Sequence, residues 1–413
     1  MTAEIIAVGS ELLTPQRVDT NSLFLTRKLN ECGIEVVRKT IIGDDRQRLA
    51  REILRARESS DVVIMTGGLG PTLDDLSRDA AADALGLKLV FHQQIVDWIE
   101  ERFRRRGRKM ADVNRRQAYI LEGAEIIRNA QGTAPGQWFE DDAGILILLP
   151  GPPRELEPVF AEECMPRFEK IESPYQYYTV SMRVTGVSES DLDQRIGPIY
   201  SAEQRVATTI LSAPGDIQIH LRAKAATQAE ARTIAEELAV LIEAELGQQI
   251  YTHKDEPLEE VVGRLFHEHG MTLAVAESCT GGLLAERITA IAGASRYFAG
   301  GFVSYTEDAK IGWLGVDPST IDGHGAVSRE TAAAMARAVR DKAKASVGAA
   351  ITGVAGPGGG TETTPVGTVF IGIASEGGVD VEERQFGGER ELIRSLAAQK
   401  TLELLLRIVR QGR

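Results

Sequence analysis

Short runs of hydrophobic residues alternate with amphipathic stretches over residues 1–170. Continuous apolar runs of this length are typical of buried strands, and apolar residues three and four positions apart are typical of helices. The alternation predicts an α/β domain with a mostly parallel sheet, helices on both faces, and ligands at the carboxyl ends of strands. The expected strands are residues 5–8, 35–42, 61–66 and 144–149, and the expected helices are residues 21–32 and 46–57.

Residues 171–252 follow a different pattern, in which apolar and polar positions alternate. The alternation over residues 177–185 and 216–222 predicts an antiparallel sheet with one solvent-exposed face. A long helix rich in Ala, Glu and Leu is expected at residues 228–246. We therefore predict a small α+β domain without a catalytic constellation of its own.

A second α/β unit is predicted over residues 253–413, which divides the 413-residue chain into the domains 1–170, 171–252 and 253–413. Glycine clusters lie between its apolar runs, as tight strand-to-helix turns require. The expected helices are residues 258–269, 280–292 and 389–410, and the expected strands are residues 272–276, 348–351 and 367–374, with another near Phe302.

Composition narrows the choice of partners and compartment. The net charge of −13 argues against bulk nucleic acid binding, which depends on neutralising phosphates. The one basic run, Arg102–Lys109, is either a solvated helix end or loop, or a patch that steers an anionic nucleotide. Three cysteines without a Cys-x-x-Cys pair argue against disulfides and a zinc knuckle. Without a signal pattern or an apolar stretch of ~20 residues, we expect a cytoplasmic protein with no membrane partner.

Ser278 lies where an expected strand ends and a helix begins, in Ala274-Val-Ala-Glu-Ser-Cys-Thr-Gly-Gly. The amides of a first helical turn are unpaired and can hold a phosphate or an oxyanion. Three interpretations are open for Ser278: a helix N-cap, which spacing alone favours, an anion-binding position, or a nucleophile. Cys279 is intrinsically more nucleophilic, but its position more often points into packing.

A nucleophilic serine needs a base, and no histidine lies in an obvious partner loop. Lys310 is the candidate if burial lowers its pKa, and its alternative is an exposed helix lysine. Tyr305 lies five residues earlier, at an expected strand-to-helix transition. The glycine-dense segment Ala350–Gly360 follows another strand and lacks the Lys-Ser/Thr of a Walker A loop, so it is either a ligand loop or a surface turn.

The N-terminal unit carries its own glycine motif, Thr66–Asp75, between a strand and a helix. Its glycines leave amides free for phosphate oxygens. Carboxylates in and near the motif either hold a divalent cation at those phosphates or only stabilise a helix N-terminus. The glycines are Gly67, Gly68 and Gly70, and the candidate cation ligands are Asp74, Asp75, Asp44 and Glu11.

Taken together, these motifs resemble the CinA family (competence/damage-inducible protein A) over the whole chain. Glu-Ser-Cys-Thr-Gly-Gly followed by Tyr-x4-Lys is the most specific of them. Those resembling the molybdopterin-binding-type N-terminal domain are Gly9–Leu13, Asp19–Ser22, Gly67–Asp75 and Gly132–Gly136. Those resembling the C-terminal domain are Glu277–Gly282, Ser304–Lys310, His324–Ser328 and Gly353–Gly359.

The resemblance implies that the C-terminal domain deamidates nicotinamide mononucleotide to nicotinic acid mononucleotide and ammonia, without a cofactor, in pyridine nucleotide salvage. For the N-terminal domain it implies an ADP-ribose pyrophosphatase that depends on a divalent cation of the Mg, Mn, Co or Ni class. A KH-like middle domain and a homodimer are also implied. The small-molecule partners are then nicotinamide mononucleotide and ADP-ribose.

The resemblance also assigns roles to individual residues. Ser278 would be the nucleophile and Lys310 the general base, with Tyr305 in the same proton network and Thr352 orienting the reacting group. The expected substrate-binding residues of this domain are Cys279, Thr280, Gly281, Gly282, Gly353 and Gly356, with the amides of residues 280–282 as oxyanion or phosphate donors.

Some positions depart from the family pattern. Thr364 replaces a lysine that many members carry, so a phosphate contact from that side chain is missing. Ser77 replaces a threonine, and Leu13–Arg17 replaces a turn richer in glycine; both border the expected pyrophosphatase pocket. Two alternatives to an enzyme stay open: a non-catalytic molybdopterin- or nucleotide-binding protein, and a competence-related scaffold.

Overall fold

The computed structural model describes residues 1–171 and 175–411. Within residues 1–171 the strands form a six-stranded sheet in the order β2-β1-β3-β8-β7-β6. Strands β2, β1, β3 and β8 run parallel, and β7 and β6 continue the sheet antiparallel. The strands are β1 Thr2–Val8, β2 Glu35–Ile42, β3 Val62–Thr66, β6 Glu125–Ile127, β7 Gly136–Asp141 and β8 Gly144–Leu149; β4 Leu89–Phe91 pairs separately with β5 Tyr119–Leu121.

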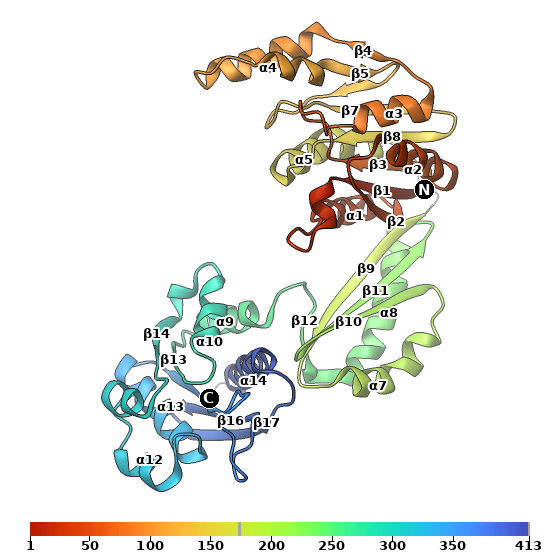
Figure 1. Cartoon of the computed structure of the whole chain (residues 1–413). Coiled ribbons are helices and arrows are strands. Elements are labelled where there is room, and N and C mark those ends of the chain that lie inside the picture. The colour runs from red at the N-terminus through yellow and green to blue at the C-terminus, as the bar shows by residue number, and fades with distance from the viewer. Residues whose placement is uncertain (172–174, 412–413) are drawn as a thin grey trace. The chain divides into compact units, whose positions relative to one another are not determined.

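Helices cover both faces of this sheet, as the sequence pattern predicts (Figure 1). Neighbouring residues of β1 point to opposite sides. Ile5 therefore joins one core with Leu25 of α1, and Ile6 joins the other with Leu49 of α2. The helices are α1 Asn21–Glu31, α2 Arg46–Ser59, α3 Ser77–Leu85, α4 Gln93–Arg105, α5 Pro153–Val159 and α6 Met165–Phe168.

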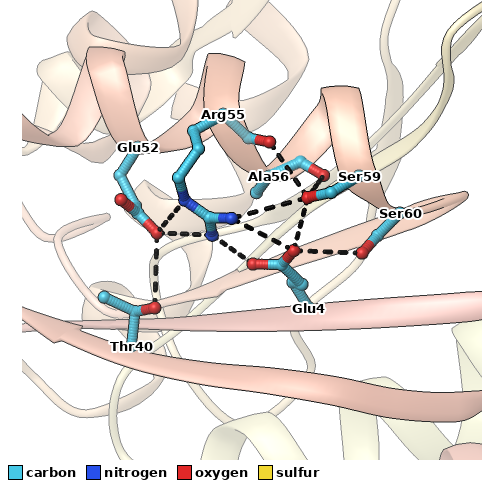
Figure 2. A network of polar contacts seen from close by, with 7 residues as sticks. All are labelled: Glu4, Thr40, Glu52, Arg55, Ala56, Ser59 and Ser60. Carbon is cyan, nitrogen blue, oxygen red and sulfur yellow. Dashed lines mark hydrogen bonds and ion pairs between the residues drawn. The ribbon is translucent and has the colours of Figure 1, made fainter.

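A buried carboxylate joins α2 to β1 (Figure 2). Glu4 accepts hydrogen bonds from Ser59 Oγ at 2.7 Å, Ser60 Oγ at 3.2 Å and both terminal nitrogens of Arg55. Burial raises the pKa of Glu4, but the hydrogen bonds from Arg55 and the serines together lower it by more. The pKa of Glu4 is therefore below its usual value. The charged carboxylate is therefore satisfied, and it fixes the register of the helix on the central strands.

Residues 175–252 form the predicted antiparallel sheet, in the order β10-β11-β9-β12. Alternate side chains of β11, including Ile217, Ile219 and Leu221, are buried, which matches the period of two in the sequence. Strand β10, which the sequence pattern does not predict, forms a hairpin with β11 through Gly215 at φ +76°. The elements are β9 Gln176–Val184, α7 Glu189–Ser201, β10 Val206–Ala213, β11 Asp216–Ala225, α8 Gln228–Leu246 and β12 Ile250–Thr252.

Residues 253–411 contain a five-stranded sheet in the order β14-β13-β15-β16-β17. Strand β13 is parallel to both of its neighbours, β14 and β15, and β16 and β17 continue the sheet antiparallel. Helices α9, α10 and α14 cover one face, and α12 and α13 cover the other. The strands are β13 Leu273–Glu277, β14 Phe298–Val303, β15 Val347–Gly353, β16 Thr368–Ser375 and β17 Gly378–Gln385. The helices are α9 Leu258–Glu268, α10 Leu283–Ala290, α11 Glu307–Ala309, α12 Pro318–His324, α13 Arg329–Ala343 and α14 Arg390–Gln411.

Candidate active site

Ser278 and Lys310 meet at the carboxyl edge of the C-terminal sheet. Lys310 Nζ lies 3.0 Å from Ser278 Oγ and 3.0 Å from the carbonyl oxygen of Ser304. Ser278 follows β13 directly, and Lys310 opens a helical turn shortly after the parallel strand β14. Because carboxyl ends of neighbouring parallel strands meet at one edge, two residues far apart in sequence become hydrogen-bond partners.

Burial decides the electrostatics of this pair. The Lys310 side chain is 2% exposed and Ser278 is 7% exposed. Burial lowers the pKa of Lys310, while Cys279 and Glu307 raise it by a smaller amount. Among the described residues no carboxylate forms an ion pair with this amine. The interpretation of Lys310 as an exposed helix lysine is therefore wrong, and a lysine in this setting loses its proton more readily than an exposed one.

Glu277, not Ser278, caps helix α10. The Glu277 side chain is 1% exposed, and its carboxylate accepts from the amides of Gly282 at 3.0 Å, Leu284 at 3.0 Å and Ala285 at 2.8 Å. An acidic group at this end also interacts favourably with the helix dipole. The N-cap interpretation of Ser278 is therefore wrong, and its hydroxyl is left to Lys310.

The expected anion donors next to Ser278 are only partly available. The Gly282 amide donates to Glu277, and the Gly281 amide donates to Ser278 O at 3.0 Å. The Thr280 amide faces the Cys279 sulfur, whose pKa burial raises to about 11. Helix α10 begins later than predicted because Gly281 and Gly282 have φ values of +61° and +97°. Thr280 therefore remains the one expected amide without an oxygen acceptor in the part of the chain that the structure describes.

Two other expected residues lie outside the proton network. The Tyr305 side chain is 53% exposed, and its hydroxyl accepts a hydrogen bond from Arg390 at 2.7 Å. Thr352 is fully buried and donates to Ala326 O at 2.7 Å, so it holds a neighbouring loop. The expectation that Tyr305 shares the proton network with Lys310 is not met, because the carbonyl of Ser304 occupies that place.

A cavity of about 650 Å³ adjoins the Ser278 loop. Arg394 lines it and donates to Thr280 O at 2.6 Å, and Arg390 lines it and donates to Gly356 O at 2.7 Å. Gly356, an expected pocket residue, is among its lining residues, whereas Gly353 pairs within the sheet with Val369. The sequence analysis missed both arginines, because they lie over a hundred residues after Ser278 and belong to no recognisable spacing. Glu389 and Glu391 line the same cavity, so its charge is mixed, and the two guanidinium groups are its candidate contacts for an anionic part of a ligand.

The expected N-terminal residues line one cavity of about 760 Å³. Within it, Asp75 accepts from the Thr72 amide at 2.7 Å and Asp44 accepts from the Ser10 amide at 2.9 Å. The Thr72 hydroxyl donates to Asp75 at 2.5 Å, and the nearby Thr72 side chain and the Asp74 amide lower the pKa of the exposed Asp74 carboxyl. The expected residues that line the cavity are Gly67, Gly68, Gly70, Glu11, Asp44, Asp74 and Asp75.

The carboxylates of this cavity form no large cluster of metal ligands. In residues 1–171 and 175–411, no group of three or more His, Cys, Asp or Glu side chains is arranged to hold a metal ion. The expected cation, held by one or two carboxylates together with the phosphates of a ligand, stays a prediction. Ser77, a departure from the family pattern, donates to Gly67 O at 2.7 Å and supports the glycine turn.

Family models match the three parts of the chain in order. "Probable molybdopterin binding domain" matches residues 4–170, "Damage-inducible protein CinA KH domain" matches 179–252, and "CinA C-terminal domain" matches 255–409. A CinA-like protein of Solibacter usitatus is 49% identical over 98% of both chains. The chain belongs to the CinA family. A CinA-like protein of Koribacter versatilis is 46% identical over 98% of this chain and 99% of its own.

Solved structures of CinA proteins align with part of the chain. The competence/damage inducible protein CihA from Agrobacterium tumefaciens is 41% identical, with a TM-score of 0.36, over 37% of this chain and 94% of its own. CinA from Thermoplasma acidophilum is 30% identical, with a TM-score of 0.37, over 40% of this chain and 99% of its own. In this CinA-family chain, no helix among the described residues is long and apolar enough to cross a membrane.

We predict that Glu277→Gln weakens the capped turn that presents Ser278. An amide replaces the charged acceptor of three backbone N–H groups, so the free energy of unfolding should fall by about 1–2 kcal/mol. Urea unfolding measures the effect. Glu376→Gln, in the exposed turn between β16 and β17 of the same domain, is the control and should leave the midpoint unchanged. Equal midpoints for both variants would contradict the cap.

Proposed function

We propose that the C-terminal domain hydrolyses the carboxamide of nicotinamide mononucleotide, giving nicotinic acid mononucleotide and ammonia. The observation that carries the proposal is the 3.0 Å contact between Lys310 Nζ and Ser278 Oγ. A buried lysine without an ion-pair partner can activate a serine in place of a histidine. The family membership supports this assignment.

The reaction needs acyl transfer from the carboxamide nitrogen to Ser278 and then to water, with proton transfers through Lys310. With a neutral amine, the same contact runs from the Ser278 hydroxyl to Nζ, and Lys310 takes the proton as Oγ attacks the carboxamide carbon. The lysine ammonium then protonates the departing nitrogen, which leaves as ammonia. Water next attacks the acyl-enzyme and gives its proton to Lys310, which releases the carboxylic acid and regenerates the serine. We therefore propose no cofactor for this step.

The neighbouring cavity supports a phosphorylated substrate. Arg390 and Arg394 line it, and Arg394 also contacts the Ser278 loop through Thr280 O. Guanidinium groups bind phosphate through paired N–H donors. They offer an anion contact that does not need the lysine replaced by Thr364 in this chain. We propose that the substrate phosphate lies on this side of Ser278.

For the N-terminal cavity we propose a phosphate-bearing ligand of nucleotide or pterin type. The glycine motif at the end of β3 and the matching molybdopterin-binding family model support it. Cleavage of ADP-ribose with a divalent cation stays a prediction, because the lining carboxylates form no cation group in the described residues. Dependence of ADP-ribose cleavage on added Mg²⁺ is the measurement that decides it. A homodimer in the cytoplasm, acting on small nucleotides, is part of the same proposal.

Ser278→Ala should lower ammonia release from nicotinamide mononucleotide by about a thousandfold or more, because the attacking oxygen is lost. Ammonia is measured with a coupled dehydrogenase assay on the purified full chain. Ser295→Ala, an exposed serine in the same domain, is the control and should retain full activity. Full activity of Ser278→Ala would remove this serine from the mechanism. No ammonia from the wild type would favour the non-catalytic or scaffold alternatives.

Lys310→Met and Lys310→Arg should both lose activity, because neither side chain can accept a proton near neutral pH. Since burial lowers the pKa of Lys310, the active neutral amine should form below the pH at which an exposed lysine loses its proton. In the wild type, kcat/KM should therefore rise with pH through this lowered pKa. Substantial activity of the arginine variant, or a profile without an acid limb, would contradict the role of base.

A further inference from the structure

Four arginines line a cleft next to the N-terminal cavity, where helix α4 ends and helix α5 begins. It consists of two adjoining hollows of about 320 and 340 Å³ that share Gly132 and Thr133. We call it the arginine cleft, and define it by Arg102, Arg106, Arg128 and Arg154.

The exposed arginines around the cleft fall into two sets that differ in their partners. Arg104 and Arg105 pair with Glu101, as expected of a solvated helix end. The side chains of Arg106 and Arg154 are also exposed but form no hydrogen bond or ion pair with any described residue. The Arg128 guanidinium lies over the face of Trp98, 5.5 Å from the ring centroid, and has no ion pair with a described residue. Three guanidinium groups thus face the hollows without a carboxylate partner.

Arg102 is hydrogen-bonded to the loop that lines the cleft, and the neighbouring positive charges repel it. Its guanidinium donates to Ala130 O at 2.7 Å and to Gln131 O. Burial lowers the pKa of Arg102, repulsion from Arg106 and Arg154 lowers it further, and Glu155 only partly opposes this. The arginines are therefore close enough to repel one another, and a bound anion would relieve that repulsion.

The loop between the hollows is held in place before any ligand arrives. Asn129 Oδ1 accepts from the amides of Gln131 at 3.0 Å and Gly132 at 2.7 Å, and its Nδ2 donates to Ala134 O at 2.9 Å. A Cβ at Gly132 would lie 1.7 Å from a Glu155 carboxylate oxygen, so any larger residue there would require the Glu155 and Asn129 side chains to move. A rigid loop lowers the entropy cost of binding.

The arginine cleft opens toward the N-terminal cavity. Thr133 and Glu155 line both the cleft and the cavity that contains the glycine motif. Thr133 is fixed by Gln117, whose Nε2 donates to its hydroxyl at 3.1 Å. A ligand in the main cavity can therefore extend past Thr133 to the guanidinium groups.

We propose that the arginine cleft is a phosphate-binding subsite for the ligand of the N-terminal cavity. Unpaired guanidiniums match phosphate oxygens in geometry and charge. A small phosphate fits hollows of about 320 and 340 Å³. A nucleic acid fits less well, because the chain carries a net charge of −13. The proposal extends the N-terminal ligand site described above and does not depend on the C-terminal reaction.

The test measures the Kd of inorganic pyrophosphate and of ADP-ribose by calorimetry on the full chain. Arg106→Gln/Arg154→Gln should weaken pyrophosphate binding by about tenfold or more, because two charged donors are lost. ADP-ribose binding should weaken in parallel. Arg38→Gln/Arg51→Gln removes the same charge from exposed positions of β2 and α2 and should change neither Kd.

Any other result contradicts either the subsite itself, its link to the N-terminal cavity, or the separate ADP-ribose prediction. Unchanged pyrophosphate binding in the cleft variant, or an equal loss in the control, would overturn the subsite. Loss of pyrophosphate binding with unchanged ADP-ribose binding would overturn the link to the main cavity. If wild type binds pyrophosphate but not ADP-ribose, the ADP-ribose prediction fails while the cleft result stands. Weaker binding of a single-stranded oligonucleotide, with pyrophosphate unaffected, would replace the phosphate subsite with a nucleic acid surface.

Discussion

An amine buried without a counter-charge is the constraint on which the C-terminal site depends. Taking a charged ammonium out of water is costly, and among the described residues Lys310 has two neutral oxygens, from Ser278 and Ser304, to offset that cost. Burial therefore lowers the pKa of the Lys310 amine, and the same two contacts fix its position. The strand ends that carry Ser278 and Ser304 are themselves tied, since the Ser304 amide donates to Glu277 O at 2.8 Å. The contacts of Lys310 with Ser278 and Ser304 thus both hold the amine in place and offset part of the cost of its burial.

Much of the fold could be predicted, because residues that face a core are apolar and recur with the spacing of a strand or a helix. The strands at 35–42 and 144–149 and the helix at 228–246 match the structure to the residue. Strand β10 could not be predicted, since it lies at the edge of its sheet with mostly exposed side chains, and its apolar residues follow no regular alternation. Helix α10 starts late for a local reason, the positive φ values of two glycines.

Some residues of the candidate site could be predicted from the sequence, and others could not. Ser278 and Lys310 were predictable as a pair from a motif at two strand ends, and the structure brings them into contact. The roles of Tyr305 and Thr352 could not be read from spacing, because a side chain's rotamer and its hydrogen-bond partners depend on packing from elsewhere. Arg390 and Arg394 belong to the C-terminal helix α14. Isolated arginines near the start of a helix have no sequence pattern that marks them as site residues.

In the proposed reaction, substrate recognition and bond breaking come from different parts of the C-terminal domain. Ser278 and Lys310 are buried just after β13 and β14, whereas Arg390 begins α14 and, among the described residues, donates hydrogen bonds to Gly356 O and the exposed Tyr305 hydroxyl. In the first turn of this helix, the exposed Arg390 side chain can therefore change without altering the contacts of Ser278 or Lys310. Paralogues with new amide substrates would then diverge at this turn while keeping the Glu-Ser-Cys-Thr-Gly-Gly segment, and directed evolution of substrate range has its natural starting point at position 390.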